Sequence, residues 1–112
     1  MYREDIFRNV IAVSNRKLCT RPFLEQIEIV CRYNPQALIL REKDLSEREY
    51  GQLGKAVKEI CEKYGVTCIY HSFYEVAEKA GVRNIHLPLW QLEKLDESYK
   101  QKSFDFIGAS IH

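Results

Sequence analysis

The sequence lacks an excess of charge of either sign, a long apolar run and a secretion signal. It has 17 basic and 16 acidic residues and a formal net charge of +1, which points neither to nucleic acid nor to an anionic membrane as a partner. Its apolar runs are far shorter than the roughly 20 residues that span a bilayer. The first residues, MYREDIF, carry acidic side chains where a signal peptide would be apolar. We therefore expect a cytoplasmic protein.

The sequence also lacks the cysteine spacing of a disulfide framework. No CxxC pair occurs, and three of the four cysteines lie in apolar patterns, where a free thiol behaves as a small hydrophobic group. Reduced, buried thiols are therefore favoured for Cys19, Cys31, Cys61 and Cys68. No linker or low-complexity segment interrupts the chain, and 112 residues support only one core. We expect residues 1–112 to form a single domain.

Short β-branched runs alternate with amphipathic segments along the chain. We expect strands at residues 9–15, 37–43, 66–72, 84–89 and 104–112. The helix after the second strand begins at a capping box of Ser46 and Glu49 and ends before Gly65. Thr20 is expected to cap the first helix, and Ser72 to open the third. A fourth helix is indicated by an apolar stripe of Leu92, Leu95 and Tyr99.

This rhythm of strand and helix predicts an α/β fold with parallel strands. Short links between strands and helices imply right-handed crossovers. Two architectures use such a pattern, the doubly wound sheet and the (β/α)8 barrel, and both bind ligands at the carboxyl ends of their strands. Polar side chains gather at those ends here, namely Ser14, Arg41, Lys43, His71, His86, Ser110 and His112.

The second expected strand carries two cations near its end. Side chains alternate across a strand, so Ile39, Arg41 and Lys43 share one face, away from the helices. Two cations that converge on one pocket are stabilised by an anion between them, and arginine binds phosphate with two hydrogen bonds. The alternative is that these cations pair with neighbouring carboxylates, such as Glu42 or Asp44. Phosphate binding and internal ion pairing remain equally open at this point.

The fifth expected strand presents a small residue, a hydroxyl and an imidazole to one cavity, because Gly108, Ser110 and His112 share a face. A histidine at this place can transfer a proton near neutral pH, or it can be a hydrogen-bonded part of the core. A metal site made by the three histidines is disfavoured, since neither a carboxylate nor a CxxC motif supports it.

Four segments occur in the order and spacing of a known family: VIAVSNRKLC, LILREKDLSEREY, IHLP and IGASIH. Together they resemble the thiamine phosphate synthase superfamily, which includes the synthase and the thiazole tautomerase (TenI) branch. The resemblance implies a (β/α)8 TIM barrel and covers the N-terminal half of it. It also implies that Arg41 and Lys43 meet a phosphate or pyrophosphate. From their places at or near the strand ends, Ser14 and His86 are expected to bind the substrate as well. His112 and Ser110 match the catalytic positions, and His71 is added as a second acid or base.

The departures from the family pattern bear on the reaction. Ile39 stands where the synthase has glutamine, His71 and Ser72 replace Asn-Asp, and the segment Pro88–Gln91 replaces a motif with an aspartate. The pyrimidine contact and the magnesium carboxylates are thereby absent, so Mg²⁺ is expected only in a synthase-like reaction. We expect a TenI-like isomerase that binds a thiazole phosphate and uses a histidine. The alternatives are a synthase, a transferase that joins pyrimidine pyrophosphate to thiazole phosphate, and a non-catalytic phosphate-binding or regulatory fragment.

The resemblance leaves the sixth to eighth strands of the barrel without a counterpart. We therefore expect a truncated half-barrel of five parallel strands and four helices. Such a half-barrel has two unpaired edges and an uncovered inner face, which favour association between chains. A homo-oligomer formed through these open edges is expected, with a phosphorylated thiazole or pyrimidine as the small-molecule partner.

Overall fold

The computed structural model describes residues 9–111. In this part of the chain, strands and helices alternate as predicted, with shorter strands than expected. The elements are β1 (Ile11–Val13), the 3-10 turn η1 (Arg16–Leu18), α2 (Phe23–Arg32), β2 (Ala37–Leu40), α3 (Glu47–Tyr64), β3 (Thr67–His71), α4 (Tyr74–Ala80), β4 (Asn84–Pro88), α5 (Leu89–Lys94), α6 (Glu97–Ser103) and β5 (Phe106–Ser110).

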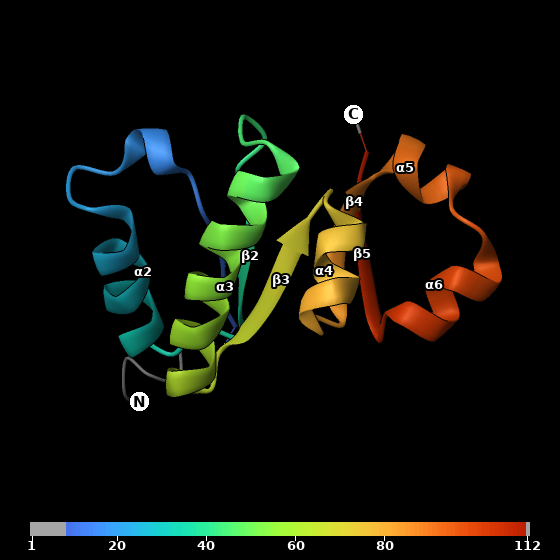
Figure 1. Cartoon of the computed structure of the whole chain (residues 1–112). Helices are drawn as coiled ribbons and strands as arrows, with labels where there is room; N and C mark the ends of the chain where they lie inside the picture. Colours follow the sequence, from blue (N-terminus) through green and yellow to red (C-terminus); the bar gives the residue numbers. More distant parts are fainter. Residues whose placement is uncertain (1–8, 112) are drawn as a thin grey trace.

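The five strands form one parallel sheet in the order β1-β2-β3-β4-β5. Helices α2, α3 and α4 lie on the same face of this sheet, and the carboxyl ends of the strands point to the end of the molecule marked C (Figure 1). A doubly wound sheet reverses its strand order and carries helices on both faces. Sequential order with helices on one face is the arrangement of a (β/α)8 barrel. The structure is therefore a half-barrel, as predicted.

The connection between β4 and β5 differs from the prediction of a single helix. Helix α5 ends at Lys94, and the backbone is extended at Leu95 and Asp96 before α6 begins. The Asp96 carboxylate accepts a hydrogen bond from the backbone N–H of Tyr99, which gives α6 its own start. The predicted stripe is retained, since Leu92, Leu95 and Tyr99 all pack against the core.

One of the three predicted helix starts is confirmed. Helix α3 has the full capping box, in which Ser46 Oγ accepts from the Glu49 N–H at 3.1 Å and Glu49 Oε1 accepts from the Ser46 N–H at 2.9 Å. The prediction for Thr20 is wrong, because α2 starts after Pro22 without a side-chain cap. The prediction for Ser72 is also wrong. This residue precedes the N-cap of α4 and has a left-handed backbone with φ of 69°.

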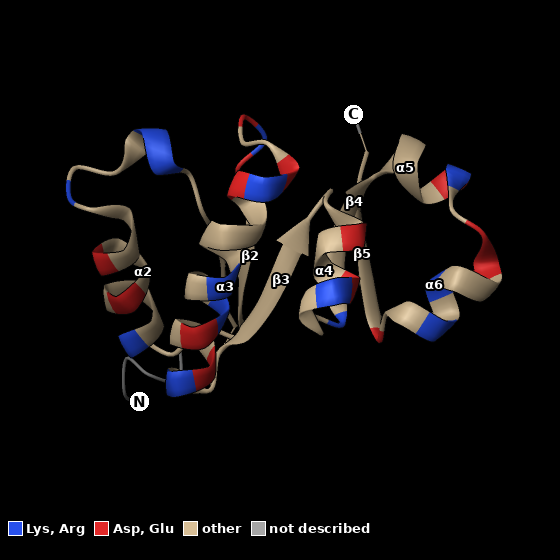
Figure 2. Cartoon of the chain, viewed as in Figure 1, with Lys and Arg blue, Asp and Glu red and all other residues tan. Residues whose placement is uncertain are grey.

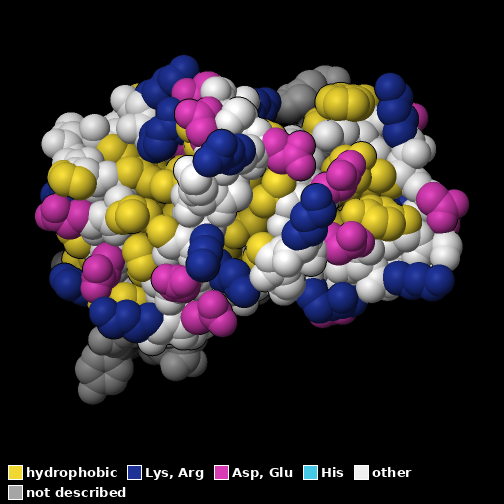
Figure 3. All heavy atoms as spheres, viewed as in Figure 1, with side chains coloured by type: hydrophobic (Ala, Val, Ile, Leu, Met, Phe, Trp, Pro, Cys, Tyr) yellow, Lys and Arg dark blue, Asp and Glu magenta, His cyan; other side chains and the backbone are white. Residues whose placement is uncertain are grey.

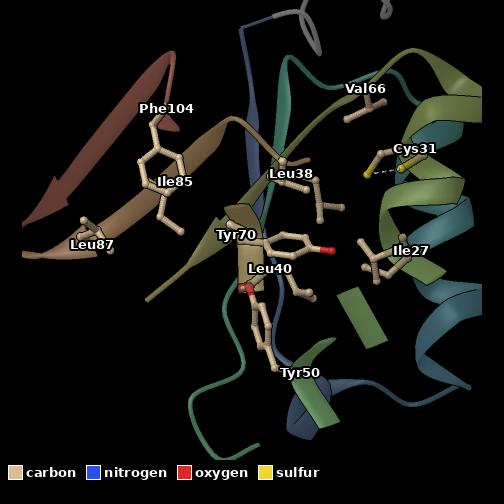
Figure 4. Close-up of a cluster of buried hydrophobic side chains, with 14 residues drawn as sticks. Ile27, Cys31, Leu38, Leu40, Tyr50, Val66, Tyr70, Ile85, Leu87 and Phe104 are labelled. Carbon is tan, nitrogen blue, oxygen red and sulfur yellow. Dashed lines mark hydrogen bonds between the residues drawn. The ribbon is translucent and has the colours of Figure 1, made fainter. Parts of the chain in front are cut away.

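The core lies between the sheet and the helices, with Tyr70 in its middle and Tyr50 at its lower edge in the view of Figure 4. Tyr50 is fully buried, and its hydroxyl donates to the Leu40 carbonyl at 2.6 Å and accepts from the His71 N–H at 2.9 Å. Tyr70 packs edge-on against it, with 5.3 Å between ring centroids. The Tyr70 hydroxyl is buried and has no hydrogen-bond partner among residues 9–111. Gly54 makes room for it, since a Cβ there would lie 2.5 Å from the Tyr70 hydroxyl.

Four free cysteines are distributed over the core and its margins. The Sγ atoms of Cys31 and Cys61 lie 4.0 Å apart between α2 and α3 (Figure 4). Both residues are buried, and the neighbouring Cys61 sulfur, followed by burial, raises the pKa of the Cys31 thiol. These thiols therefore act as apolar contacts between the two helices.

One face of the sheet is covered by helices, and, among residues 9–111, the other is not. On the helical side, charged side chains are interspersed with apolar ones (Figure 3). The opposite face, which lines the interior in a closed barrel, leaves apolar side chains about half exposed at Ile11, Val13 and Phe106. Within the described residues, no helix has the length and apolar character needed to cross a membrane.

Candidate functional site

The loop after β2 carries two cations, Arg41 and Lys43. Because β2 ends at Leu40, Arg41 and Lys43 lie in the loop rather than in the strand as predicted. Both side chains are exposed, and neither forms an ion pair within residues 9–111. Figure 2 shows charged residues in this loop, at the same end of the sheet as the C-terminus. The two cations are therefore free to bind an anion.

The neighbouring carboxylates are paired with the loop after β1. Arg16 Nη1 lies 3.0 Å from Glu42 Oε1, and Arg16 Nη2 lies 2.8 Å from Asp44 Oδ2. The hydrogen bond from Arg16 lowers the pKa of the Asp44 carboxyl. Internal pairing of Arg41 and Lys43 with these two acids, the alternative left open by the sequence, is wrong because Arg16 already occupies them.

Ser14 belongs to the same network. Its hydroxyl donates to Glu42 Oε2 at 2.7 Å and accepts from the backbone N–H of Arg41 at 2.9 Å, and the residue is 8% exposed. Ser14 therefore holds the start of the cationic loop against the end of β1. Direct contact of Ser14 with a ligand stays a prediction.

His71 at the end of β3 and His86 in β4 lie side by side. The parallel register pairs the two residues directly, and their rings are 5.3 Å apart between centroids with an interplanar angle of 20°. Because side chains alternate along a strand, both rings project from the sheet face opposite Tyr70 and the helices. His71 is 3% exposed, whereas His86 is half-buried.

Both imidazoles are held in the neutral form. Burial, followed by the proximity of His86, Arg41 and Lys43, lowers the pKa of His71 to about 4. Burial and then Arg41 also lower the pKa of His86. Neutral imidazoles accept protons and hydrogen bonds, so the pair offers acceptors beside two permanent cations.

Ser110 and Gly108 of β5 complete this group on the same sheet face. The Ser110 hydroxyl lies 3.4 Å from His86 Nδ1 and 3.5 Å from His86 Nε2. Gly108 is paired with His86 in the register, and a Cβ at this position would lie 2.8 Å from His86 Cδ2. The absence of a side chain at residue 108 therefore lets the imidazole lie against β5.

A cavity of about 420 Å³ opens at the carboxyl ends of β3, β4 and β5. This volume is in the range of small-molecule sites. Three predicted site residues line the cavity, and five further ones complete its wall: Lys43, His71 and Ser110, with Ser72, Phe73, Pro88, Trp90 and Gln91. The site thus combines a cation, a neutral imidazole, a hydroxyl and an exposed aromatic ring.

Comparison with known protein families gives this arrangement a context. A sequence model described as thiamine monophosphate synthase matches residues 10–112. The chain belongs to the thiamine monophosphate synthase family. The resemblance inferred from the four sequence segments is thereby confirmed.

Individual relatives within the thiamine monophosphate synthase family agree with this assignment. Thiamine-phosphate synthase 2 of Streptococcus pneumoniae is 35% identical over 65 residues, which cover 58% of this chain and 31% of the relative. Thiamine-phosphate synthase of Caldanaerobacter subterraneus is 32% identical over 63 residues, or 56% of this chain and 29% of the relative. The relatives are named synthases, so the expectation of a TenI-like protein finds no support in them.

The fold also matches that of a solved structure. Thiamine phosphate pyrophosphorylase from Pyrococcus furiosus matches with a TM-score of 0.73 and 18% identity, over 91% of this chain and 49% of that protein. The likeness at this identity concerns the fold alone. This chain spans less than half the length of each of these three proteins.

The structure brings most of the predicted site residues together. Arg41, Lys43, His71, His86 and Ser110 meet at one end of the sheet, whereas His112 lies outside the described residues. Within residues 9–111, no cluster of three or more His, Cys, Asp or Glu residues is placed to hold a metal ion.

Sequence reasoning on single strand ends missed the contribution of two residues, Trp90 and Gln91. They were noted only as departures from the family pattern. Their position one or two residues beyond a barrel strand, where ligand-binding loops begin, was the signal that could have identified them.

Proposed function

We propose that this chain forms the phosphate-binding part of a thiamine phosphate synthase-type site, which takes a phosphorylated pyrimidine or thiazole. The observation that carries the proposal is the cation pair, Arg41 and Lys43, which forms no ion pair within residues 9–111 and lies beside an uncharged His71–His86 pair. A phosphate or pyrophosphate between the two cations relieves their mutual repulsion, and the guanidinium forms two parallel hydrogen bonds to it. Ser14 fixes the backbone of Arg41 and thereby the direction of the loop.

Magnesium does not fit the side chains of this part of the site. The nearby carboxylates, Glu42 and Asp44, are both engaged by Arg16. Mg²⁺ requires near-octahedral oxygen ligands, and exposed cations beside the site disfavour it further. We therefore assign no step to magnesium within residues 9–111, and the role of the proposed cations is electrostatic stabilisation of the anionic leaving group.

The second candidate function is thiazole tautomerisation, which the neutral histidine pair favours. A proton acceptor must be uncharged to act, and a pKa lowered to about 4 keeps His71 uncharged at neutral pH, while it also makes His71 a weaker base than an ordinary imidazole. In this alternative, His71 and Ser110 move or orient the proton at a thiazole phosphate, together with His112.

Titration calorimetry with the full chain separates these candidates. We expect a pyrimidine pyrophosphate, a thiazole phosphate or both to bind, and Arg41→Ala with Lys43→Ala to weaken binding about tenfold or more. Arg48→Ala is the matched control, since Arg48 is an exposed arginine on α3. If the control variant loses as much affinity as the double variant, Arg41 and Lys43 are not the phosphate-binding residues. Preference for thiazole phosphate with turnover would favour the isomerase.

We also propose that copies of this chain associate through the uncovered sheet face and the β1 and β5 edges, in the cytoplasm. The half-exposed side chains of Ile11, Val13 and Phe106 support this, because their burial removes apolar surface from water. Light scattering of the full chain is expected to give a mass above that of one chain. A Val13→Lys variant should shift the mass toward the monomer, and a stable wild-type monomer would refute the proposal.

A further inference from the structure

Two acidic residues share a loop with the cations of the proposed anion site. Glu42 lies between Arg41 and Lys43 in the sequence, and Asp44 is the next residue of the loop. A carboxylate so close to a cation pair lowers the affinity of that pair for an anion, either by direct pairing or through its own negative charge. The strength of the anion site therefore depends on what holds these two acids away from the cations.

Arg16, in the 3-10 turn that follows β1, binds both acids with one guanidinium group. Its Nη1 atom donates to Glu42 Oε1 at 3.0 Å and to Asp44 Oδ1 at 3.1 Å, and its Nη2 atom donates to Asp44 Oδ2 at 2.8 Å. Such a two-pronged contact is available to a planar guanidinium and not to an ammonium group. Lys17 Nζ also approaches Asp44 Oδ2, but at the longer distance of 3.9 Å. Arg16 is thus the main partner of both acids.

Glu42 is turned into the protein, whereas the cations on either side of it are exposed. Only 4% of the Glu42 surface is accessible. Both of its carboxylate oxygens accept from the backbone N–H of Arg16 at 3.1 Å, and Oε2 also accepts from the Ser14 hydroxyl at 2.7 Å. A buried carboxylate is stable only when it is paired and hydrogen-bonded. The guanidinium of Arg16 therefore supports the inward orientation of Glu42, which separates this negative charge from the cation pair.

We propose that Arg16 is a positioning residue of the anion site: it holds the two acids of the loop and thereby leaves the cation pair available to a phosphate. This inference rests on the proposed function and adds to it a residue from the neighbouring loop. Removal of Arg16 is expected to weaken anion binding because it releases Asp44, an exposed acid, as a competitor. Loss of one positive charge would also weaken binding, but that effect does not depend on Asp44.

The test is a double-variant cycle of Arg16→Met and Asp44→Asn, with titration calorimetry of inorganic pyrophosphate on the full chain. We expect Arg16→Met to weaken binding about tenfold, and the added Asp44→Asn to restore the affinity to within about threefold of the wild type. Asp44→Asn alone should change the affinity less than about twofold, because Arg16 already neutralises that carboxylate. If only net charge mattered, Asp44→Asn would tighten binding by the same factor with and without Arg16.

A second variant, Arg16→Lys, keeps the proposal testable if Arg16→Met does not fold. Lysine retains the charge without the planar fork, so we expect it to hold one acid and to give a smaller loss, which Asp44→Asn again reverses. The matched control is the exposed ion pair of Arg83 and Asp105, 3.0 Å long, just before β4 and β5 at their amino ends. Arg83→Met changes the net charge as Arg16→Met does and should leave the pyrophosphate affinity unchanged. Urea unfolding establishes that each variant is folded.

Failure of the inference and failure of the proposed function give different results. If the wild type binds pyrophosphate through Arg41 and Lys43 but the effects of the Arg16 and Asp44 substitutions are additive, the inference is refuted and the anion site stands. An equal loss of affinity in Arg83→Met also refutes the inference. If the wild type does not bind pyrophosphate, the proposed function is refuted, and the inference fails with it.

Discussion

Acidification is expected to destabilise this protein through His71 at pH values well above the range in which carboxyl groups titrate. In the folded protein the pKa of His71 is lowered to about 4, first by burial and then by His86, Arg41 and Lys43. In the unfolded chain an imidazole has its ordinary pKa of about 6.5. Between these values the unfolded state binds a proton that the folded state does not, so the free energy of unfolding falls as the pH falls. A difference of one pKa unit between the folded and unfolded states corresponds to about 1.4 kcal/mol of unfolding free energy. Protonation of His71 alone is therefore expected to lower the free energy of unfolding by about 3 kcal/mol.

The assay is urea unfolding at several pH values from about 7.5 to about 4.5, on the wild type and on His71→Phe. The wild type should lose stability steadily below about pH 6.5, and the variant should lose much less. Carboxyl groups with lowered pKa values, such as Asp44 and Asp105, begin to lose their stabilising contribution only near pH 5, at the lower end of this window, and they do so in both proteins. Equal pH slopes in both proteins, or a His71 pKa near 6.5 by NMR, would refute the reasoning.

Two further pairs of variants test the core around the tyrosines. Gly54→Ala should destabilise by about 1–3 kcal/mol, because the new Cβ would lie 2.5 Å from the Tyr70 hydroxyl. Gly51→Ala in the same helix would place its Cβ 3.6 Å from Val76 Cγ1, an ordinary contact, and should be neutral or stabilising in thermal unfolding; similar losses at both positions would contradict the packing argument. Tyr50→Phe should cost about 1–3 kcal/mol, since two hydrogen bonds to its hydroxyl are lost. Tyr70→Phe removes a hydroxyl that has no hydrogen-bond partner among residues 9–111 and should cost little, and the reverse ranking would overturn this assignment.

The order of strands and helices could be predicted because the local features of the sequence all agree with it. Alternating strands and helices, short links and the capping box at Ser46 are local features, and the structure retains them. The single helix predicted before β5 was wrong because an apolar stripe continues across Leu95 and Asp96, where the backbone leaves the helix. Ser72 has the composition of a cap but adopts a left-handed backbone instead. Such backbone choices depend on tertiary contacts, which periodicity does not report.

The position of the site could be predicted from the sequence, but the ion pairs of its charged residues could not be predicted equally well. Strand ends and side-chain alternation brought Arg41, Lys43, His71 and Ser110 to one end of the sheet without knowledge of the register. The partner of each charge could not be obtained in this way, since Arg16 neutralises Glu42 from a loop 26 residues away. Whether two cations are free depends on such long-range competition, and a residue's neighbours in sequence are a poor guide to it.

The core and the site are joined through the Tyr50 hydroxyl. It donates to the carbonyl of Leu40, the last residue of β2, and accepts from the N–H of His71, the last residue of β3. One buried group therefore fixes the ends of the two strands from which the cationic loop and the histidine pair project. Because Arg41 follows Leu40 directly, the spacing between the cations and the imidazoles depends on this bridge. The geometry of the anion site is consequently a property of the core, and the site does not need its own rigid loop to be preorganised.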